Sequence, residues 1–417
     1  MCILNNINNE WMVEKLRGPY FLELDSEGEV ERIFKEIGCD QSGRKIMSQK
    51  SNIIPLFLKE VKSPAANILK QQMLSLGGEA VVGRGVINCS QECSDVLLLG
   101  TRKVYAMLAE KICLQPWSLK TLGEKIKALL VNLEKKKIVT WKWPGCQLTL
   151  GDKTLIMGIL NVTPDSFSDG GKFVELSQAV EHAWEMVEAG ADIIDVGGES
   201  TRPGCNTVST EEELRRVLPI LEKLLLEEIP VPISIDTYKA TVAEEALSSG
   251  AQIINDVGGG LKDPRMAEVV ARSQAPVIVM HNPEKGMYND LLPDILDSLA
   301  AQVKIYEDAG LSSDKIVIDP GVGFGKDCQE NLVVMKNLKS FCALGKPVLL
   351  GVSRKSFIGK TLDLPVTDRL EGSLAAAAWG VMSDMDIIRV HDVRETVRLV
   401  KVLEAIKMEG FSSEGTR

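Results

Sequence analysis

The sequence predicts an α/β protein: a (β/α)8 TIM barrel preceded by a smaller α+β domain. From residue 150 to residue 410, short apolar runs alternate with segments of helical periodicity, and eight such pairs follow one another. The apolar runs are almost continuous in Ile, Val and Leu, which indicates a parallel sheet buried on both faces by helices. Eight units favour a closed barrel over an open sheet, and no GxGxxG follows the first run to suggest a dinucleotide-binding fold.

The eight strands can be placed one by one from these runs. Each is followed by a helical pattern, as in "LSQAVEHAWEMVEAGA", "YKATVAEEALSSGA" and "RETVRLVKVLEAIK". The predicted strands are residues 155–160, 192–196, 231–235, 252–255, 276–280, 315–318, 347–352 and 386–390.

Residues 1–140 are organised differently, and we predict a separate α+β domain there. The segments "NIIPLFLKEV" and "EAVVGRGVI" have the composition of strands. "PAANILKQQMLSL" begins with Pro64 and ends before Gly77 and Gly78, as a helix would. "LKTLGEKIKALLVNLEKKK" repeats apolar residues at helical spacing, and the Lys-rich and Trp-Pro-Gly stretch "EKKKIVTWKWPGC" divides this region from the barrel at 150–410. No catalytic residue types gather in the first domain, so its role stays open.

Composition limits the class of protein. The chain has 417 residues, of which 45% are hydrophobic and 25% charged, enough for a full core. A net charge of −10 argues against nucleic-acid binding, and the apolar runs are too short to span a membrane. Nine cysteines without the spacing of a disulfide scaffold, and no signal-peptide pattern at the start, predict a cytoplasmic protein with reduced thiols.

Polar residues follow every predicted strand. In a barrel of parallel strands the carboxyl ends lie together and carry the active site. A single polar strand end could be a helix cap or a satisfied core group, but eight that converge on one rim predict a small-molecule site. In chain order the strands lead into Asn161, "DVGGESTRPG", Asp236, Asn255 with Asp256, His281, "DPGVGFGK", "SRKS" and "RVHD".

One side of this rim suits a flat heterocycle. The carboxylates of Asp236 and Asp319 and the amide of Asn255 offer acceptors, and one donor, to a polar ring rich in N–H groups. Apolar faces and a further donor complete the predicted set, which adds Met280, Phe324 and Lys355.

The other side suits an anion. Closure of the barrel brings the last strand beside the first, and with it Arg389 and His391 beside Asn161. A guanidinium, an imidazole and a carboxamide together could hold a diphosphate with a divalent cation that shares its oxygens.

These segments resemble a known family in sequence and in order. "MGILNVTPDSFSDGGKF" and "GADIIDVGGESTRPG" are similar to the two signature motifs of the dihydropteroate synthases, the pterin-binding barrel enzymes of folate biosynthesis and sulfonamide targets. "SIDT", "INDV", "DPGVGFGK", "SRKSFIG" and "RVHDV" follow in that family's order. The resemblance covers residues 150 to about 405 and leaves the first domain unexplained.

The resemblance implies a reaction and a role for each matching residue. The reaction is the condensation of (7,8-dihydropterin-6-yl)methyl diphosphate with p-aminobenzoate, giving 7,8-dihydropteroate and diphosphate, with Mg2+ as cofactor and commonly in a homodimer. Asp236, Asn255, Asp319 and Lys355 would hold the pterin. Asn161, Arg389 and His391 would hold the diphosphate, and Asn161 also the Mg2+; the catalytic set would be Asp236, Lys355, Arg389 and His391. The p-aminobenzoate site would be formed by Phe167, Asp169, Thr201, Arg202, Pro203, Lys355 and Ser356.

The polar loop "NVTPDSFSDGGKF" (161–173) has a function in this scheme. Water would trap an activated pterin, so the site has to be closed during the reaction. Gly170 and Gly171 give the loop backbone freedom to open and close, and we interpret it as a lid.

The sequence leaves alternatives open. A methyltetrahydrofolate:corrinoid methyltransferase could share the Asp, Asn and Asp pocket, but would not need "STRPG" or "RVHD". A catalytically silent barrel that acts as a regulator would keep the fold without turnover. A second folate-pathway activity in the first domain is disfavoured, because that domain lacks a dense cluster of His, Asp or Glu.

Overall fold

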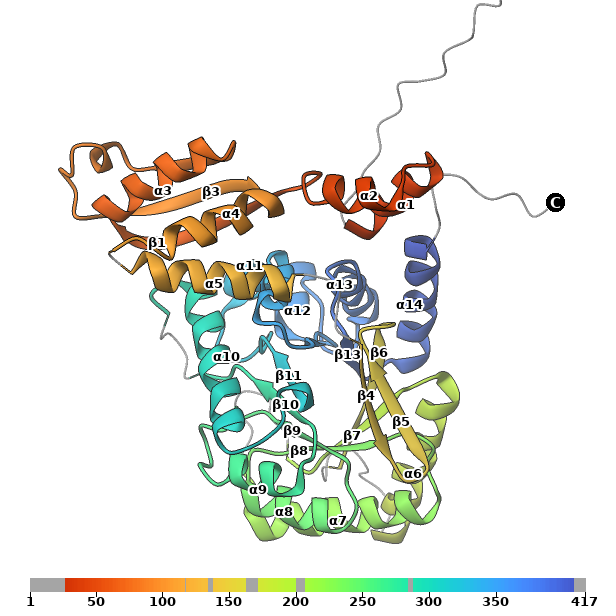
Figure 1. Cartoon of the computed structure of the whole chain (residues 1–417). Coiled ribbons are helices and arrows are strands. Elements are labelled where there is room, and N and C mark those ends of the chain that lie inside the picture. Colours follow the sequence, from red (N-terminus) through yellow and green to blue (C-terminus); the bar gives the residue numbers. More distant parts are fainter. Residues whose placement is uncertain are drawn as a thin grey trace, which may run out of the picture. The chain divides into compact units, whose positions relative to one another are not determined.

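The structure is a computed structural model, and it describes residues 27–116, 118–133, 138–162, 172–199, 207–283 and 288–408. The chain divides into two compact units between Glu124 and Lys125, within a single helix, α5 (Leu119–Asn132) (Figure 1). The border predicted from the sequence, between residues 140 and 150, lies beyond this division. Each unit is described by itself.

The second unit contains the barrel. Its eight strands are parallel and pair in the order β11-β10-β9-β8-β7-β6-β13-β12, and a bridge between Ile318 and Val348 joins the two ends of this series. Each strand begins at or just after its predicted start, and β13 pairs with β6 as expected. The strands are β6 (Leu155–Asn161), β7 (Ile193–Gly197), β8 (Ile233–Asp236), β9 (Ile253–Asp256), β10 (Val277–Met280), β11 (Ile316–Asp319), β12 (Leu349–Gly351) and β13 (Ile387–Val390).

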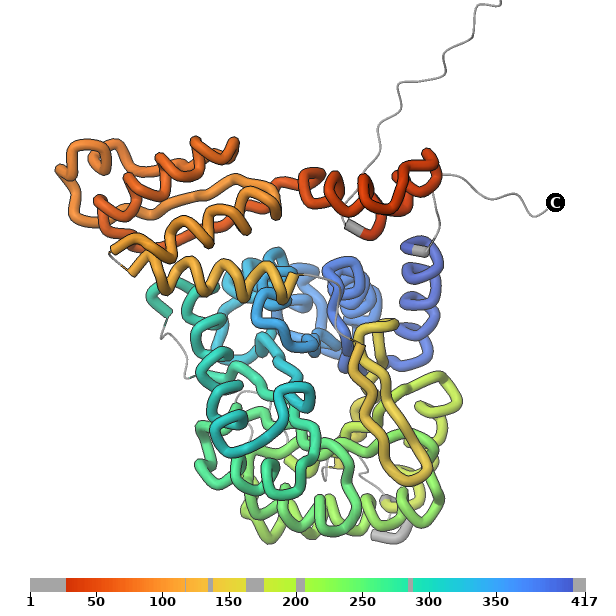
Figure 2. Tube along the Cα trace, viewed as in Figure 1, coloured from red at the N-terminus to blue at the C-terminus, as the bar shows by residue number. Residues whose placement is uncertain are grey.

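Helices return the chain from each strand to the next and cover the outside of the barrel, as the trace in Figure 2 shows. Alternate strand residues such as Ile194, Ile235 and Ile254 pack outward against these helices in one continuous apolar core. The helices are α6 (Lys172–Ala189), α7 (Thr210–Leu226), α8 (Ala240–Ser248), α9 (Met266–Ser273), α10 (Leu291–Asp308), α11 (Cys328–Lys336), α12 (Ser356–Leu362), α13 (Leu370–Met382) and α14 (Val393–Met408).

A hairpin of β4 (Val139–Trp143) and β5 (Cys146–Leu150) covers the amino-terminal end of the barrel. This hairpin was not predicted, because its Lys, Trp, Pro and Gly residues indicated only a dividing segment. The side chain of Trp141 is 6% exposed, and its indole Nε1 donates to the carbonyl of Asp314 at 3.0 Å. The hairpin packs on the inward residues of the strands in a second core of Val139, Trp141, Leu148, Leu150, Leu155, Met157, Ile193, Ile253, Ile278, Val317, Leu349 and Ile387.

The first unit is a small α+β domain with an antiparallel sheet in the order β1-β3-β2. The phenolic hydroxyl of Tyr105 lies 2.6 Å from the carbonyl of Ile54 and 2.9 Å from that of Leu98, which fixes α4 to the sheet. Its elements are α1 (Glu27–Glu36), α2 (Gln41–Ser48), β1 (Ile53–Lys62), α3 (Ser63–Ser75), β2 (Glu79–Val82), η1 (Arg84–Val86), β3 (Cys93–Thr101), α4 (Arg102–Ile112) and the start of α5.

One strand prediction in this domain was too long. The run "EAVVGRGVI" was expected to be extended throughout, but β2 ends at Val82 and a 3-10 turn follows at Arg84–Val86. The backbone N–H of Gly83 donates to the side-chain hydroxyl of Ser94 on β3 at 2.9 Å, and the regular backbone pairing of β2 with β3 ends at Val82. Strand β3 was not predicted at all.

Among the helices that the structure describes, none is long and apolar enough to cross a membrane.

The hairpin gives a test of the fold. Replacing Trp141 by Ala removes its indole from the second core, and we expect the free energy of unfolding to fall by about 3–5 kcal/mol. Lys142→Ala changes an exposed residue of the same strand and serves as the control. Urea denaturation followed by circular dichroism measures both, and equal stability of the two variants would contradict the packing described.

Candidate functional site

A pocket opens at the carboxyl ends of the strands. It is lined by groups from β8, β9, β10, β11, β12, β13 and the turns that follow them. Its residues are Asp236, Asn255, Val257, Met280, Asp319, Phe324, Gly351, Lys355 and Arg389. The structure therefore brings together all six side chains that the sequence assigned to the heterocycle.

Arg389 lies between two buried carboxylates at the base of this pocket. Its Nε donates to Asp195 Oδ2 at 2.6 Å and its Nη2 to Asp236 Oδ2 at 2.7 Å. Burial raises the pKa of Asp236 to about 7, although the guanidinium opposes this shift. Burial also acts to lower the pKa of Arg389, but the two carboxylates raise it above its ordinary value.

Asp195 was not singled out by the sequence analysis, although it is fully buried and central to the site. Its Oδ2 also accepts from Nδ2 of Asn255 at 3.0 Å. A signal was present: Asp195 interrupts the apolar run of β7, and a charge in a strand buried on both faces requires a partner. The partner, Arg389, is distant in sequence, so only the closed barrel identifies it.

Two carboxylate oxygens near the carboxyl ends of the strands lack a partner within the described part of the chain, and one of them, on Asp236, belongs to a pocket residue. Among the described residues, Oδ1 of Asp236 and Oδ1 of Asp195 are buried without a hydrogen-bond partner. Buried polar atoms in native proteins are nearly always paired, so the open oxygen of Asp236 is a candidate contact for an N–H group of a ligand.

Asp319 and the turn after it form another wall. Oδ1 of Asp319 accepts from the backbone N–H of Gly321 at 2.7 Å. Burial raises the pKa of this carboxyl, although the hydrogen bond from Gly321 and the charge of Lys355 act to lower it. The Lys355 ammonium lies 3.9 Å from the centre of the Phe324 ring, a cation–π contact. A side chain at Gly323 would come within 2.7 Å of Lys355 Cδ, so this close approach requires glycine.

The residues assigned to the anion lie at the ends of β6 and β13, which are neighbouring strands. Nδ1 of His391 lies 3.0 Å from the hydroxyl of Ser353, whose oxygen also accepts from the His391 backbone N–H at 3.3 Å. Asn161 and Asp236 both approach Gly197 at the end of β7. A Cβ atom added to this glycine would lie 3.8 Å from Asn161 Oδ1 and 3.8 Å from Asp236 Oδ2. Arg389 differs from the expectation in one respect: its guanidinium also pairs with the carboxylates on the heterocycle side.

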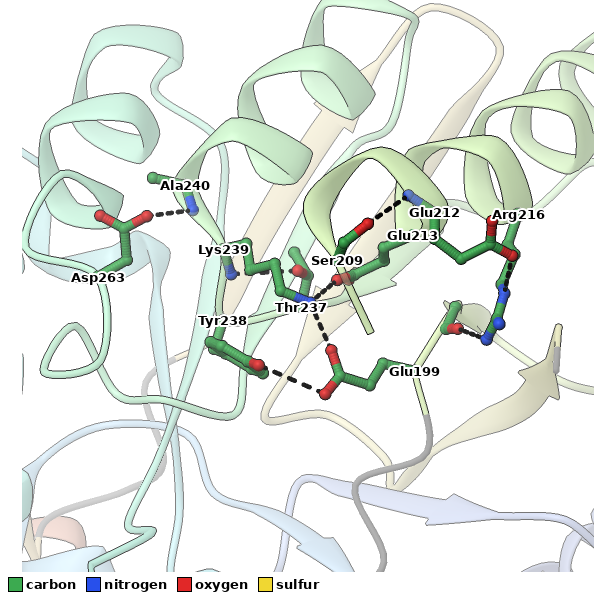
Figure 3. A network of polar contacts seen from close by, with 11 residues as sticks. Glu199, Ser209, Glu212, Glu213, Arg216, Thr237, Tyr238, Lys239, Ala240 and Asp263 are labelled. Carbon is green, nitrogen blue, oxygen red and sulfur yellow. Dashed lines mark hydrogen bonds and ion pairs between the residues drawn. The ribbon is translucent and has the colours of Figure 1, made fainter. Parts of the chain in front are cut away.

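A network of charged residues holds the start of the loop after β7 (Figure 3). The Lys239 ammonium lies 2.5 Å from Glu199 Oε2 and 2.5 Å from Glu213 Oε2, and Tyr238 donates to Glu199 at 3.3 Å. Arg216 donates to the carbonyl of Gly198 at 2.9 Å. These contacts, none of which was predicted, anchor the segment that leads into "STRPG".

The residues predicted for p-aminobenzoate are mostly not placed. Ser356 is exposed at the first position of α12, directly after Lys355. Lys355 lines the pocket described above. The remaining five residues lie outside the described part of the chain, as does most of the predicted lid at 161–173; they are Phe167, Asp169, Thr201, Arg202 and Pro203.

Within the described parts of the chain, no group of three or more His, Cys, Asp and Glu residues could hold a metal ion. A metal bound mainly through a substrate needs fewer protein ligands, and Mg2+ commonly takes one or two oxygens from protein together with phosphate oxygens. The amide oxygen of Asn161, at the partly exposed end of β6, is a donor of this type.

Comparison with known proteins identifies the family of the chain. The family model "Pterin binding enzyme" matches residues 157–391. The chain is 52% identical over 268 residues to the dihydropteroate synthase of Bacillus subtilis (strain 168), covering 64% of this chain and 94% of that protein. It is 40% identical over 357 residues to a probable bifunctional folylpolyglutamate synthase/dihydropteroate synthase of Halobacterium salinarum, covering 83% of this chain and 42% of that protein.

Solved structures give the same result. A dihydropteroate synthase from Clostridium difficile, determined in the presence of pteroic acid, superposes with a TM-score of 0.61 at 50% identity, covering 62% of this chain and 99% of that one. The Xanthomonas albilineans enzyme in complex with 7,8-dihydropteroate gives a TM-score of 0.58 at 39% identity, covering 62% of this chain and 95% of that one. The chain belongs to the pterin-binding enzyme family, and within it to the dihydropteroate synthases.

Proposed function

We propose that the protein joins (7,8-dihydropterin-6-yl)methyl diphosphate to p-aminobenzoate, forming 7,8-dihydropteroate and diphosphate. The open Oδ1 of Asp236, buried in a pocket with Asn255, Asp319 and Lys355, carries this proposal. It offers a charged acceptor where the ring N–H groups of a pterin would be bound. The names of the relatives support the same reaction.

The pterin ring is held by complementary groups. Asp236 and Asp319 accept from its N–H groups, and Asn255 and Lys355 complete the hydrogen bonds. Met280, which is 2% exposed, and Phe324 contact its faces. A pyrimidine ring with several N–H groups fits a pocket with several carboxylates better than a purely apolar ligand would.

The diphosphate lies toward Asn161, Arg389 and His391. Arg389 has further N–H groups besides the two that bind Asp195 and Asp236, and these can donate to phosphate oxygens. Asn161 would hold Mg2+ together with those oxygens. When bound, this ion supplies positive charge that stabilises the departing diphosphate.

The chemistry is a substitution at the exocyclic methylene carbon. The carbon–oxygen bond breaks and its electron pair leaves with diphosphate, while the amine nitrogen of p-aminobenzoate forms the new carbon–nitrogen bond and then loses a proton. Positive charge spreads into the pterin ring during this step, and the carboxylate of Asp236 stabilises it. Arg389 and His391 stabilise the anion that departs.

The p-aminobenzoate side is proposed from the sequence. Phe167, Asp169, Thr201, Arg202, Pro203 and Ser356 would surround this substrate, and the loops that carry them would exclude water. A Xanthomonas albilineans relative was solved with 4-aminobenzoic acid and a Yersinia pestis relative with a sulfonamide drug, so we propose that sulfonamides compete at this site. Cytoplasmic location and a homodimer stay predictions.

Diphosphate release by the full-length protein tests the reaction. With dihydropterin diphosphate and Mg2+, we expect release that depends on p-aminobenzoate. Asp236→Asn removes the charged acceptor and Arg389→Ala the guanidinium, and each should lower kcat/KM by about 100-fold or more. Arg215→Ala, at an exposed position of α7, is the control and should keep full activity. A folded protein that binds pterin without turnover would favour the methyltransferase or the silent barrel instead.

The raised pKa of Asp236 predicts a pH dependence. Below a pKa of about 7 this carboxyl is mostly protonated and neutral; above it the carboxylate is present and can stabilise the cationic ring. We therefore expect kcat/KM to rise about tenfold between pH 6 and pH 8, and to level off above that. The residual activity of Asp236→Asn should not rise with pH; if it did, another group would be responsible.

The metal role of Asn161 can be tested separately. Removal of Mg2+ with EDTA should abolish turnover, and added Mg2+ should restore it. Asn161→Ala should raise the Mg2+ concentration needed for half-maximal activity by about tenfold, since outer or single ligands commonly contribute at this level. Asn161→Asp keeps an oxygen at this position and should need less Mg2+ than the Ala variant. Identical Mg2+ curves for wild type and Asn161→Ala would exclude the assignment.

A further inference from the structure

Lys326 is a buried lysine that lies behind the pocket wall and does not line it. The residue is 8% exposed, and its Nζ has three partners. They are the carbonyl of Gly321 at 2.9 Å, the carbonyl of Phe324 at 3.1 Å and Nδ1 of His281 at 3.1 Å.

The three partners lie in the segments that follow two different strands of the barrel. Gly321 and Phe324 are in the turn between β11 and α11, and His281 directly follows β10. Phe324 lines the pocket itself, and Met280 and Asp319, which also line it, are the last residues of β10 and β11. One ammonium group therefore joins the ends of two strands that carry pocket residues.

The turn after β11 needs such a donor. Gly321 has φ of 66°, and a side chain there would collide with the carbonyl of His281, so the turn packs tightly on the end of β10. The carbonyl of Gly321 is buried and that of Phe324 is partly buried, where an unpaired acceptor is costly. Asn331 holds the same turn from α11: its Oδ1 accepts from the Gly323 N–H at 2.6 Å, and its Nδ2 donates to the Lys326 carbonyl at 3.2 Å.

We propose that Lys326 is a positioning residue for the pterin: by joining the β11 turn to His281 it sets the positions of Phe324 and Asp319. It acts through these residues and does not touch the substrate. This inference rests on the proposed function, since it assumes that the pocket takes a pterin. A rigid support behind the contact residues is needed because displacements of about 1 Å can change binding and rate strongly.

The electrostatics support this arrangement. Burial lowers the pKa of His281 to about 3, so its imidazole is neutral and Nδ1 can accept from the ammonium. Burial also lowers the pKa of Lys326 to about 7. The negative charges of Asp319 and Glu330 act to raise this pKa, and the positive charge of Lys355 acts to lower it. A neutral Lys326 amine could still donate to both carbonyls. It would then accept from the Nδ1–H of the other neutral tautomer of His281, so the three contacts persist in either state of the lysine.

The test is a comparison of two buried lysines in the full-length protein. Lys326→Met should raise the Kd for pteroic acid and the KM for dihydropterin diphosphate by about tenfold or more, with the KM for p-aminobenzoate unchanged. Lys346→Met is the matched control: Lys346 lies near the amino-terminal end of β11, its side chain is 7% exposed, and it binds Glu307 and Ser313. That variant should lose stability and keep its pterin affinity.

A second pair of variants addresses the contact with His281. His281→Leu removes the acceptor and should weaken pteroic acid binding, whereas His281→Asn keeps an acceptor near the Nδ1 position and should recover most of it. If Lys326→Met fails to fold, these two variants still test whether the contact between Lys326 and His281 supports pterin binding. Wild-type affinity for pteroic acid in a folded Lys326→Met or His281→Leu protein would overturn the proposal, as would an equal rise in both KM values. A wild-type protein that binds no pteroic acid would instead overturn the proposed function.

Discussion

The site depends on one partly buried guanidinium shared by two buried carboxylates. Arg389 from β13 reaches across the barrel to Asp195 on β7 and Asp236 on β8, and Asn255 donates to the same Asp195 oxygen. Desolvation of such a cluster is unfavourable, and burying charges is tolerated only when each one is paired and hydrogen-bonded. Here the pairing is incomplete, because each carboxylate keeps one open oxygen among the described residues. A ligand with N–H groups would complete it.

The barrel can hold this unfavourable cluster because its other end is apolar and closed. The β4–β5 hairpin packs on the inward side chains at the amino-terminal end, with Trp141 at its centre. Hydrophobic burial there and along the helices supplies the stability, while the polar residues are confined to the carboxyl ends. The same strand serves both purposes: β6 begins with Leu155 in the closed core and ends with Asn161 at the rim.

The sequence predicted what is local and periodic. Strand ends follow from apolar runs, so the placement of Asp236, Asn255 and Asp319 at the rim follows from the order of residues along the chain. Contacts set by closure of the barrel, such as Arg389 with Asp195, could not be predicted in this way, because the partners are far apart in the chain. The hairpin was missed for another reason: its Trp and Lys residues alternate over only a few positions, and the Pro-Gly turn resembled a linker.

The charges around the pocket explain how one site can bind a neutral ring and also stabilise a cation. Asp195, Asp236 and Asp319 are opposed by Arg389, Lys355 and Lys326, so the fully ionised cluster is close to neutral. Asp236 and Lys326 both have pKa values near 7, and loss of a proton from either one makes the pocket more negative by one charge. Selective stabilisation of the transition state requires charge that is already in place when positive charge develops on the ring. Because burial shifts both pKa values, the fold itself adjusts this charge.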